Sequence, residues 1–324
     1  MQASLRRMLY ACVVFWSALL LLLVQPVLTK AILPWFGGSA GVWTTSMLFF
    51  QTVLLLGYLY AHLLHRTLAL RWQILLHCAL LVMAVLMLPL HPSVASKPSG
   101  GADPVPRILG LLFSSAGLPY FLLSATSPLL QSWFASTNRT ELPWRLFAIS
   151  NLGSLVALLS YPILIEPRLT VEDQLRYWSL GFLLFAVSCA ATGLLSWRLE
   201  KRAAATVLPR WPRLFTWLGL AAVPSVLWLA VANQISQDVA AIPFLWILPL
   251  ALYLLSFFLT FESDLWYRPR LYKWLLPIAW TGVLVVVAKQ SSLHIMWTIV
   301  LYSFVLFLCC MFCHGELARL RPES

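Results

Sequence analysis

The sequence predicts an all-α, polytopic membrane protein built as a bundle of about ten transmembrane helices. Hydrophobic residues make up 61% of the 324 residues and charged residues only 10%, whereas a soluble domain carries about a quarter charged residues. Apolar stretches of about 20 residues, the length that spans a bilayer, recur along the whole chain. Lysine and arginine gather in alternate connections between these stretches. Together these observations identify lipid as the main solvent of the protein.

The expected spans follow each other closely from the N-terminus. Their residue ranges are 8–28, 44–64, 73–91, 108–130, 146–165, 176–197, 214–232, 242–261, 274–290 and 292–313. The ninth span is short and nearly continuous with the tenth. The first is not expected to be a cleaved signal peptide. Its apolar run is longer than the apolar region of a signal, and "QPVLTKAILPW" follows without a small-residue cleavage site.

The positive charges give the orientation, because cytoplasmic loops retain lysine and arginine. Sixteen of the 22 lie on the side that holds both termini, and the other six lie on the opposite side. Both termini are therefore predicted to be cytoplasmic. This topology accounts for the net charge of +11, so the charge indicates no nucleic-acid partner.

The most basic connection divides the chain into two membrane halves. We expect a six-helix half at 1–197, a basic cytoplasmic loop at 198–213, a second half of about four helices at 214–313 and a cytoplasmic tail at 314–324. The strings "VQPVLTKAILPW" and "ANQISQDVAAIPFLW" suggest a weak repeat, since each places amide and hydroxyl side chains before a proline and an aromatic residue. A six-helix offset of this kind is how major facilitator transporters are built, and on that pattern the second half is incomplete.

Uncharged polar residues lie within the expected spans, whereas none of the eleven acids falls near a predicted midplane. This disfavours proton coupling through a buried carboxylate. The serine, threonine and glycine residues of spans 108–130 and 146–165 allow two interpretations. One is close packing of helices; the other is a polar cavity, because an unpaired amide in lipid is costly. The candidate cavity residues are Gln25, Lys30, Ser127, Asn151, Ser154 and Asp238.

Lys30 itself allows two interpretations. Lys30, Asp238 and Glu166 are all expected near the outer ends of their spans, and if the first and seventh spans are neighbours, as in facilitators, Lys30 could pair with Asp238. The preferred interpretation is that Lys30 extends to lipid headgroups, as interfacial lysines do.

Two patterns point weakly to metal or haem chemistry. His62 and His65 share one helical face, with His77 on the next span, but no carboxylate or thiol completes a ligand set. Cys310, Cys313 and His314 spell the C-x-x-C-H of covalent haem attachment. Haem is attached on the outer face of a bacterial membrane, whereas this string is predicted at the cytoplasmic end of the last span. We therefore expect no metal and no cofactor.

Several strings resemble the membrane portion of a bacterial family of spermidine synthase-like membrane proteins. The strings are "LLVQPVLTKAILPWFGGSAGVWTTSMLFFQTVLLLGYLYAH", "YFLLSATSPLLQSWFA", "FAISNLGSLVALLSYP" and "CHGELARLRP". In that family a facilitator-like membrane region is followed by a cytoplasmic aminopropyltransferase-like domain. The resemblance implies a multi-pass protein of the bacterial inner membrane. This chain has no glycine-rich turn after a strand to hold an adenosyl cofactor, so no catalytic residue carries over.

Two functions are expected from these features. The first is a non-catalytic, transporter-like membrane module that moves or senses a small solute, or that anchors a cytoplasmic enzyme. The alternative is the membrane subunit of a split aminopropyltransferase-like enzyme. The expected partners are the lipid bilayer and an unidentified small solute. If the chain serves an enzyme, a cytoplasmic aminopropyltransferase-like protein is its expected partner, and His314, Glu316 and Arg319 are the expected docking residues.

Overall fold

The fold is wholly helical in the residues that the structure describes. The computed structural model describes residues 2–37, 40–91, 103–137, 144–198, 211–238, 247–289 and 295–320. The helices are α1 (Gln2–Ile32), η1 (Leu33–Phe36), α2 (Ala40–Thr67), α3 (Leu70–Leu86), α4 (Pro104–Leu112), η3 (Phe113–Gly117), α5 (Leu118–Thr137), α6 (Trp144–Ser160), η4 (Tyr161–Ile165), α7 (Val171–Arg198), α8 (Trp211–Asp238), α9 (Ile247–Glu262), η6 (Asp264–Trp266), α10 (Pro269–Lys289) and α11 (Ile295–Arg319). The predicted helical class is confirmed.

Seven helical stretches of the described chain are long and apolar enough to cross a membrane. They are Arg6–Phe36, Gly41–Thr67, Pro104–Ser136, Trp144–Ile165, Val171–Arg198, Arg213–Ile235 and Met296–Arg319. Two further apolar helices, α3 and α9, are shorter. Helix α10 (21 residues) coincides with the predicted ninth span but is not among these stretches. Its first turns carry Arg270 and Lys273, which shorten its apolar run.

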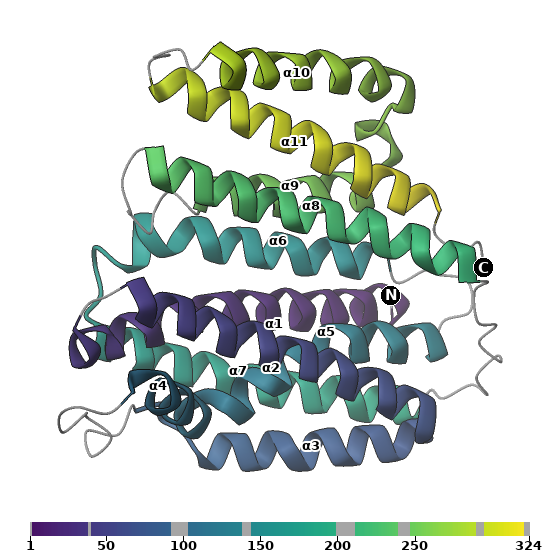
Figure 1. The fold of residues 1–324 in the computed structure, drawn as a ribbon. Helices are drawn as coiled ribbons and strands as arrows, with labels where there is room; N and C mark the ends of the chain where they lie inside the picture. Colours follow the sequence, from purple (N-terminus) through teal and green to yellow (C-terminus); the bar gives the residue numbers. More distant parts are fainter. Residues whose placement is uncertain are drawn as a thin grey trace. The chain divides into compact units, whose positions relative to one another are not determined.

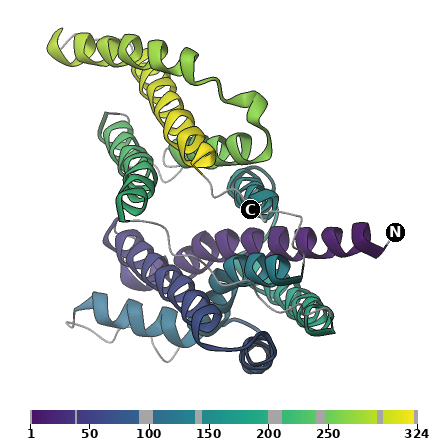
Figure 2. The ribbon, with the colours of Figure 1, turned by 90° about the vertical axis from the view of Figure 1, so that its right-hand side faces the viewer.

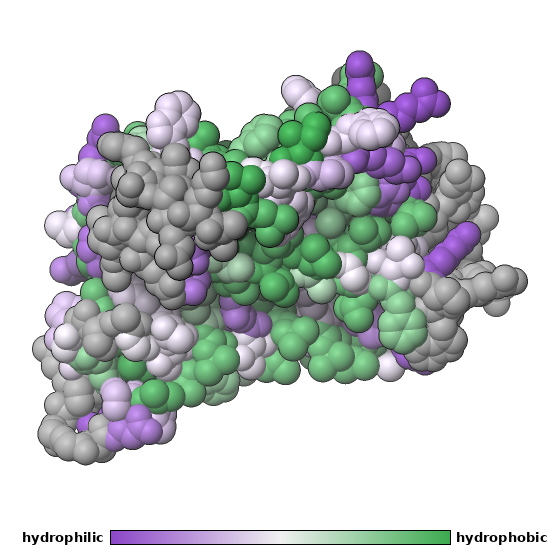
Figure 3. Space-filling model, turned by 45° about the horizontal axis from the view of Figure 1, so that its top comes forward, coloured by the Kyte–Doolittle hydropathy of each residue, from purple (hydrophilic) through white to green (hydrophobic). Residues whose placement is uncertain are grey.

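Large apolar side chains cover much of the outside. Leu86, Phe113 and Trp274 are 79%, 70% and 77% exposed, and hydrophobic side chains occupy much of the described surface in Figure 3. Monomeric soluble proteins rarely expose large contiguous apolar patches. The outward-facing apolar residues therefore agree with a helical protein that lies in a bilayer.

The chain forms two compact units, residues 1–203 and 204–324. The boundary lies within the basic segment 198–213. Each unit has its own hydrophobic core.

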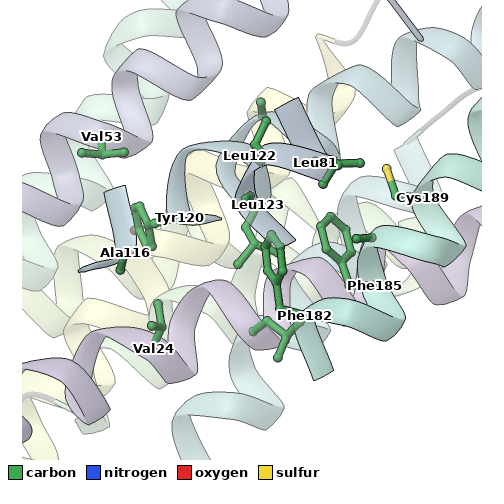
Figure 4. Close-up of a cluster of buried hydrophobic side chains, with 14 of the residues drawn as sticks. Val24, Val53, Leu81, Ala116, Tyr120, Leu122, Leu123, Phe182, Phe185 and Cys189 are labelled. Atoms are coloured by element: carbon green, nitrogen blue, oxygen red, sulfur yellow. The ribbon is translucent and has the colours of Figure 1, made fainter. Parts of the chain in front are cut away.

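Helix α1 is the central element of the first unit and packs against α5, α6 and α7 (Figure 1). Two tryptophans fix α1 to α7 reciprocally. The indole of Trp16 donates to the Gly181 carbonyl, and that of Trp178 donates to the Leu20 carbonyl, each at 2.9 Å. The core between α1, α2, α3, α5 and α7 is filled by aliphatic and aromatic side chains (Figure 4). The first unit is thus a packed bundle around α1.

Two short π-helices interrupt the first unit. The segment η3 separates α4 from α5, and Figure 1 views α4 nearly along its axis while α3 lies across the view. The predicted span 108–130 is therefore one helical stretch that bends at η3. The second π-helix, η4, extends α6 to Ile165. Single-turn π segments occur frequently at functional sites.

Helix α11 is the central element of the second unit and contacts α8, α9 and α10. Figure 2 shows it running obliquely from α10 past α9. Its core residues include Val305, Cys309 and Met311, which pack with Tyr267 and Tyr272. The second unit thus depends on the C-terminal helix for its core.

Candidate functional site

An ion pair joins the ends of α1 and α6. The Lys30 Nζ atom lies 2.7 Å from Glu166 Oε1, and the two side chains are 37% and 35% exposed. Lys30 is in the last turn of α1, and Glu166 directly follows η4. Lys30 therefore has a partner within the first unit that differs from the two suggested for it, Asp238 and a lipid headgroup. The side chain of Asp238, at the end of α8, lies outside those that the structure describes.

The direction of α6 explains this pairing. A Cβ built on Gly153 would lie 2.5 Å from the Phe15 carbonyl oxygen, so α6 touches α1 there, and Glu166 meets Lys30 further along both helices. The two helices therefore run in the same direction. Lys30 and Glu166 are 136 positions apart in the sequence, so their expected place near the same outer face did not by itself predict that they pair.

A second polar contact links α1 to α5 one turn earlier. The Gln25 Nε2 atom donates to the Tyr120 hydroxyl at 3.1 Å, and Tyr120 is only 1% exposed. Thr29 returns a hydrogen bond to the Gln25 carbonyl at 2.8 Å. Pro26 follows Gln25 inside α1 and has no amide hydrogen to contribute to the helix. The predicted Gln25 thus has a specific partner that the sequence did not suggest.

Tyr161 adds a buried hydroxyl without a hydrogen-bond partner in the described part of the chain. The residue starts η4 and is 7% exposed, and its carbonyl accepts from the Glu166 amide at 2.8 Å. Leaving such a hydroxyl unpaired costs about 1–3 kcal/mol, and an unsatisfied buried group calls for an explanation. We refer to Gln25, Lys30, Tyr120, Tyr161 and Glu166 as the Lys30 cluster.

The remaining predicted cavity residues lie at another level of the bundle. Ser127 accepts from Gln131 at 3.1 Å and donates to Ser150 at 3.2 Å, which links α5 to α6. Asn151 donates to the Phe147 carbonyl of its own helix at 2.9 Å, and Ser154 is half-buried. Gly153 of α6 lies opposite Phe15 of α1. Because a helix rises about 1.5 Å per residue, this level of the bundle is roughly 15 Å from Gln25 along α1. The five candidates of the first unit therefore do not line one site.

The histidines of the first unit are also apart. His65 of α2 hydrogen-bonds Ser132 of α5 at 2.6 Å. His77 is 1% exposed and lies between the rings of Tyr60 and Trp133. Across the described ranges, no three His, Cys, Asp or Glu side chains are placed to hold a metal ion.

His314 is an internal residue of the second unit. It is fully buried, and its ring stacks on Phe257 with centroids 3.5 Å apart. Its Nδ1 atom lies 2.9 Å from Ser256 Oγ, while that hydroxyl donates to the Tyr253 carbonyl. This contact joins α11 to α9, and which of Nδ1 and Ser256 Oγ donates depends on the tautomer of the ring. A docking role for the His314 side chain does not fit this burial, and one face of its ring is covered by Phe257.

The next two residues hold the connection between α9 and α10. Gly315 faces the ring of Tyr267, which would lie 2.4 Å from a Cβ at that position. The Tyr267 hydroxyl donates to Glu316 Oε1 at 2.7 Å, and Arg319 reaches the same oxygen at 3.0 Å. Burial, with the hydrogen bond to Glu316, raises the pKa of the Tyr267 phenol, so it remains a donor. We refer to Tyr267, His314, Gly315 and Glu316 as the C-terminal clamp.

The clamp leaves little of the predicted docking set free. Glu316 is 24% exposed and has two partners, whereas Arg319 is 58% exposed. The "CHGELAR" string thus has an internal packing role that the sequence did not reveal, since neither Tyr267 nor Ser256 is near it in the chain.

Comparison with family models, curated proteins and solved structures found no match to this chain. The resemblance to spermidine synthase-like membrane proteins therefore stays a prediction.

Replacing Lys30 with glutamine is expected to change stability by less than about 1 kcal/mol, because half-exposed ion pairs contribute little. Thermal unfolding of the K30Q protein in detergent, beside the charge-swapped pair K30E/E166K, measures this. A loss of several kcal/mol in K30Q that the swap restores would show that the pair is a structural requirement rather than an accessible polar site.

Proposed function

We propose that the chain is a non-catalytic, transporter-like membrane module that moves or senses a small, hydrogen-bonding solute at the Lys30 cluster. The single observation that carries the proposal is the composition of that cluster. It combines an accessible ion pair with a buried hydroxyl that has no partner among the described residues, at the ends of helices long and apolar enough to span a membrane. Polar and ionisable groups in such positions are expensive and mark solute pathways by default.

The arrangement of the cluster gives it a means of responding to a solute. Its side chains come from three helices, α1, α5 and the α6–η4 stretch. A solute that hydrogen-bonds Tyr161 and competes for Lys30 or Glu166 would change how these helix ends are joined. The exchange of one polar contact for another costs little, because the ion pair is already about a third exposed.

We also propose a location, an orientation and a two-half architecture for the protein. We place the protein in a bacterial inner membrane, with both termini in the cytoplasm and the Lys30 cluster towards the outer face. The charge distribution supports this orientation, since sixteen of the 22 lysines and arginines fall on the side of the termini. The six-helix first part supports a facilitator-like plan of two halves.

Uptake into proteoliposomes tests the function. A panel of labelled amino acids, organic cations including polyamines, and organic anions is offered to vesicles that contain the purified chain. At least one class should accumulate above protein-free vesicles, and the Gln25→Leu variant should lose that uptake because Tyr120 and the cluster lose their amide contact.

The matched control is Gln131→Leu, which removes the same amide from α5 at a site away from the cluster. It should retain uptake at close to the parent rate. Equal uptake by the two variants would remove the Lys30 cluster from the pathway, and no uptake of any class would remove transport itself.

A further inference from the structure

The connection between α9 and α10 displays apolar and basic side chains together. Leu265, Trp266 and Trp274 are 83%, 57% and 77% exposed. Arg268, Arg270 and Lys273 are exposed among them. We refer to these six residues as the 265–274 surface. It brings three positive charges and two tryptophans into ten consecutive residues.

The backbone that carries this surface is fixed from within. Tyr267 is 8% exposed, with its ring against Gly315 and its hydroxyl on Glu316. Tyr272 is also 8% exposed and packs beside Tyr267, with ring centroids 5.2 Å apart. The two tyrosines point inward, and the tryptophans and cations between and beside them are exposed. The buried tyrosines therefore hold the backbone that carries the exposed charges. Because the backbone of this segment is already held in place, a ligand that binds there loses little free energy to ordering the segment.

The three cations lack an internal partner in the part of the chain that the structure describes. Elsewhere in the second unit Arg319 pairs with Glu316, and in the first unit Lys30 pairs with Glu166. Within the described ranges neither ion pair involves Arg268, Arg270 or Lys273. Their charge is therefore available to a partner outside the chain.

The side-chain types identify that partner. Tryptophan is enriched at the level of lipid headgroups, because its ring is amphipathic. Basic residues next to a membrane helix attract anionic lipids by about 1 kcal/mol per charge. Contact with lipid tails alone would not explain why three cations are exposed here. Binding of a soluble acidic protein would not explain why tryptophans lie beside the end of an apolar helix.

We propose that the 265–274 surface is a docking site for anionic phospholipid headgroups of the leaflet that faces it. The two tryptophans lie at the headgroup level, and Arg268, Arg270 and Lys273 contact the phosphates. This site shares no residue with the Lys30 cluster, and lipid binding at it does not depend on whether the protein transfers a solute.

Lipid retention by the purified full-length chain tests the proposal. The protein is exchanged into detergent micelles that contain equal amounts of phosphatidylglycerol and phosphatidylcholine, and retained lipid is counted by native mass spectrometry. The parent protein should retain phosphatidylglycerol preferentially. The R268Q/R270Q/K273Q variant should lose about tenfold or more of that preference, given the attraction expected for three charges.

The matched control is R66Q/R71Q/R213Q, which removes the same net charge from exposed positions elsewhere on the predicted cytoplasmic side. It should lose less than about twofold of the preference. Equal losses in the two variants would show a general effect of charge and overturn the site. A parent protein with no preference for phosphatidylglycerol would also overturn it and would favour an acidic protein surface as the partner. Unchanged circular dichroism and elution volume confirm that both variants fold.

Discussion

The Gly315→Ala variant is expected to lose stability throughout the second unit. The added Cβ would lie 2.4–2.6 Å from three atoms of the Tyr267 ring, a separation that no side-chain rotation at residue 315 can relieve. Overpacking of this kind costs about 1–3 kcal/mol. The ring must move, and its hydroxyl then leaves Glu316. Thermal unfolding in detergent should show a fall of roughly 5 °C or more.

Gly219→Ala is the control for this change. It lies in α8 of the same unit, and nothing lies within 4 Å of the Cβ position, so alanine should be neutral or stabilising there. The double variant G315A/Y267A should lose less than the sum of the two single losses, because the clash is removed with the ring. Additive losses would show that Gly315 matters for a reason other than Tyr267.

The Gly153→Ala variant is expected to separate α6 from α1 and to destabilise the first unit. The nearest atom to the new Cβ is the Phe15 carbonyl oxygen at 2.5 Å. That oxygen belongs to the backbone of α1, so relief requires a helix to shift rather than a side chain. The effect should equal or exceed that of Gly315→Ala, and it is measured by the same unfolding experiment.

Gly110→Ala in α4 is the corresponding control, since it too has nothing within 4 Å of the Cβ position. If Gly153→Ala unfolds at the same temperature as Gly110→Ala, the close approach of α1 and α6 is wrong. The Lys30–Glu166 pair, which depends on that approach, would then also be in doubt.

The positions of the helices could be predicted because apolar length is a local property of the sequence. The expected span 44–64 lies within α2, and 176–197 lies within α7. The bend at η3 was not predicted, because the serines and glycine of residues 113–117 (FSSAG) were interpreted as helix-packing or cavity residues rather than as a break in the helix. The expected span 274–290 falls almost wholly within α10, which begins earlier, at Pro269, and carries Arg270 and Lys273 ahead of its apolar run.

The polar contacts were less predictable, because each depends on which helices are neighbours. Gln25 and Lys30 were identified from their residue types. Their partners Tyr120 and Glu166 lie 95 and 136 residues away. The expected partners of Lys30 were lipid headgroups or, on the facilitator analogy, Asp238, whereas in the fold Glu166 at the end of the α6–η4 stretch pairs with it.

The C-terminal string shows the same dependence on long-range packing. Read alone, Cys310, Cys313 and His314 indicate haem attachment. In the fold His314 bonds Ser256 and stacks on Phe257 of α9. Gly315 and Glu316 hold Tyr267. His314, Gly315 and Glu316 thus each have a packing or hydrogen-bonding role, and that role appears only in the folded second unit.

Labelling of single cysteines in intact cells tests most directly whether the Lys30 cluster is accessible to solutes from outside. A membrane-impermeant thiol reagent is applied to cells that produce Gln25→Cys, Glu166→Cys or Leu56→Cys, with the parent protein as background for its six native cysteines. Leu56 is 48% exposed on an apolar helix, so its replacement reports lipid contact. We expect labelling of Glu166→Cys and Gln25→Cys and none of Leu56→Cys. Labelling of Glu166→Cys without Gln25→Cys would contradict an open cluster, and labelling of both only in inverted vesicles would reverse the orientation.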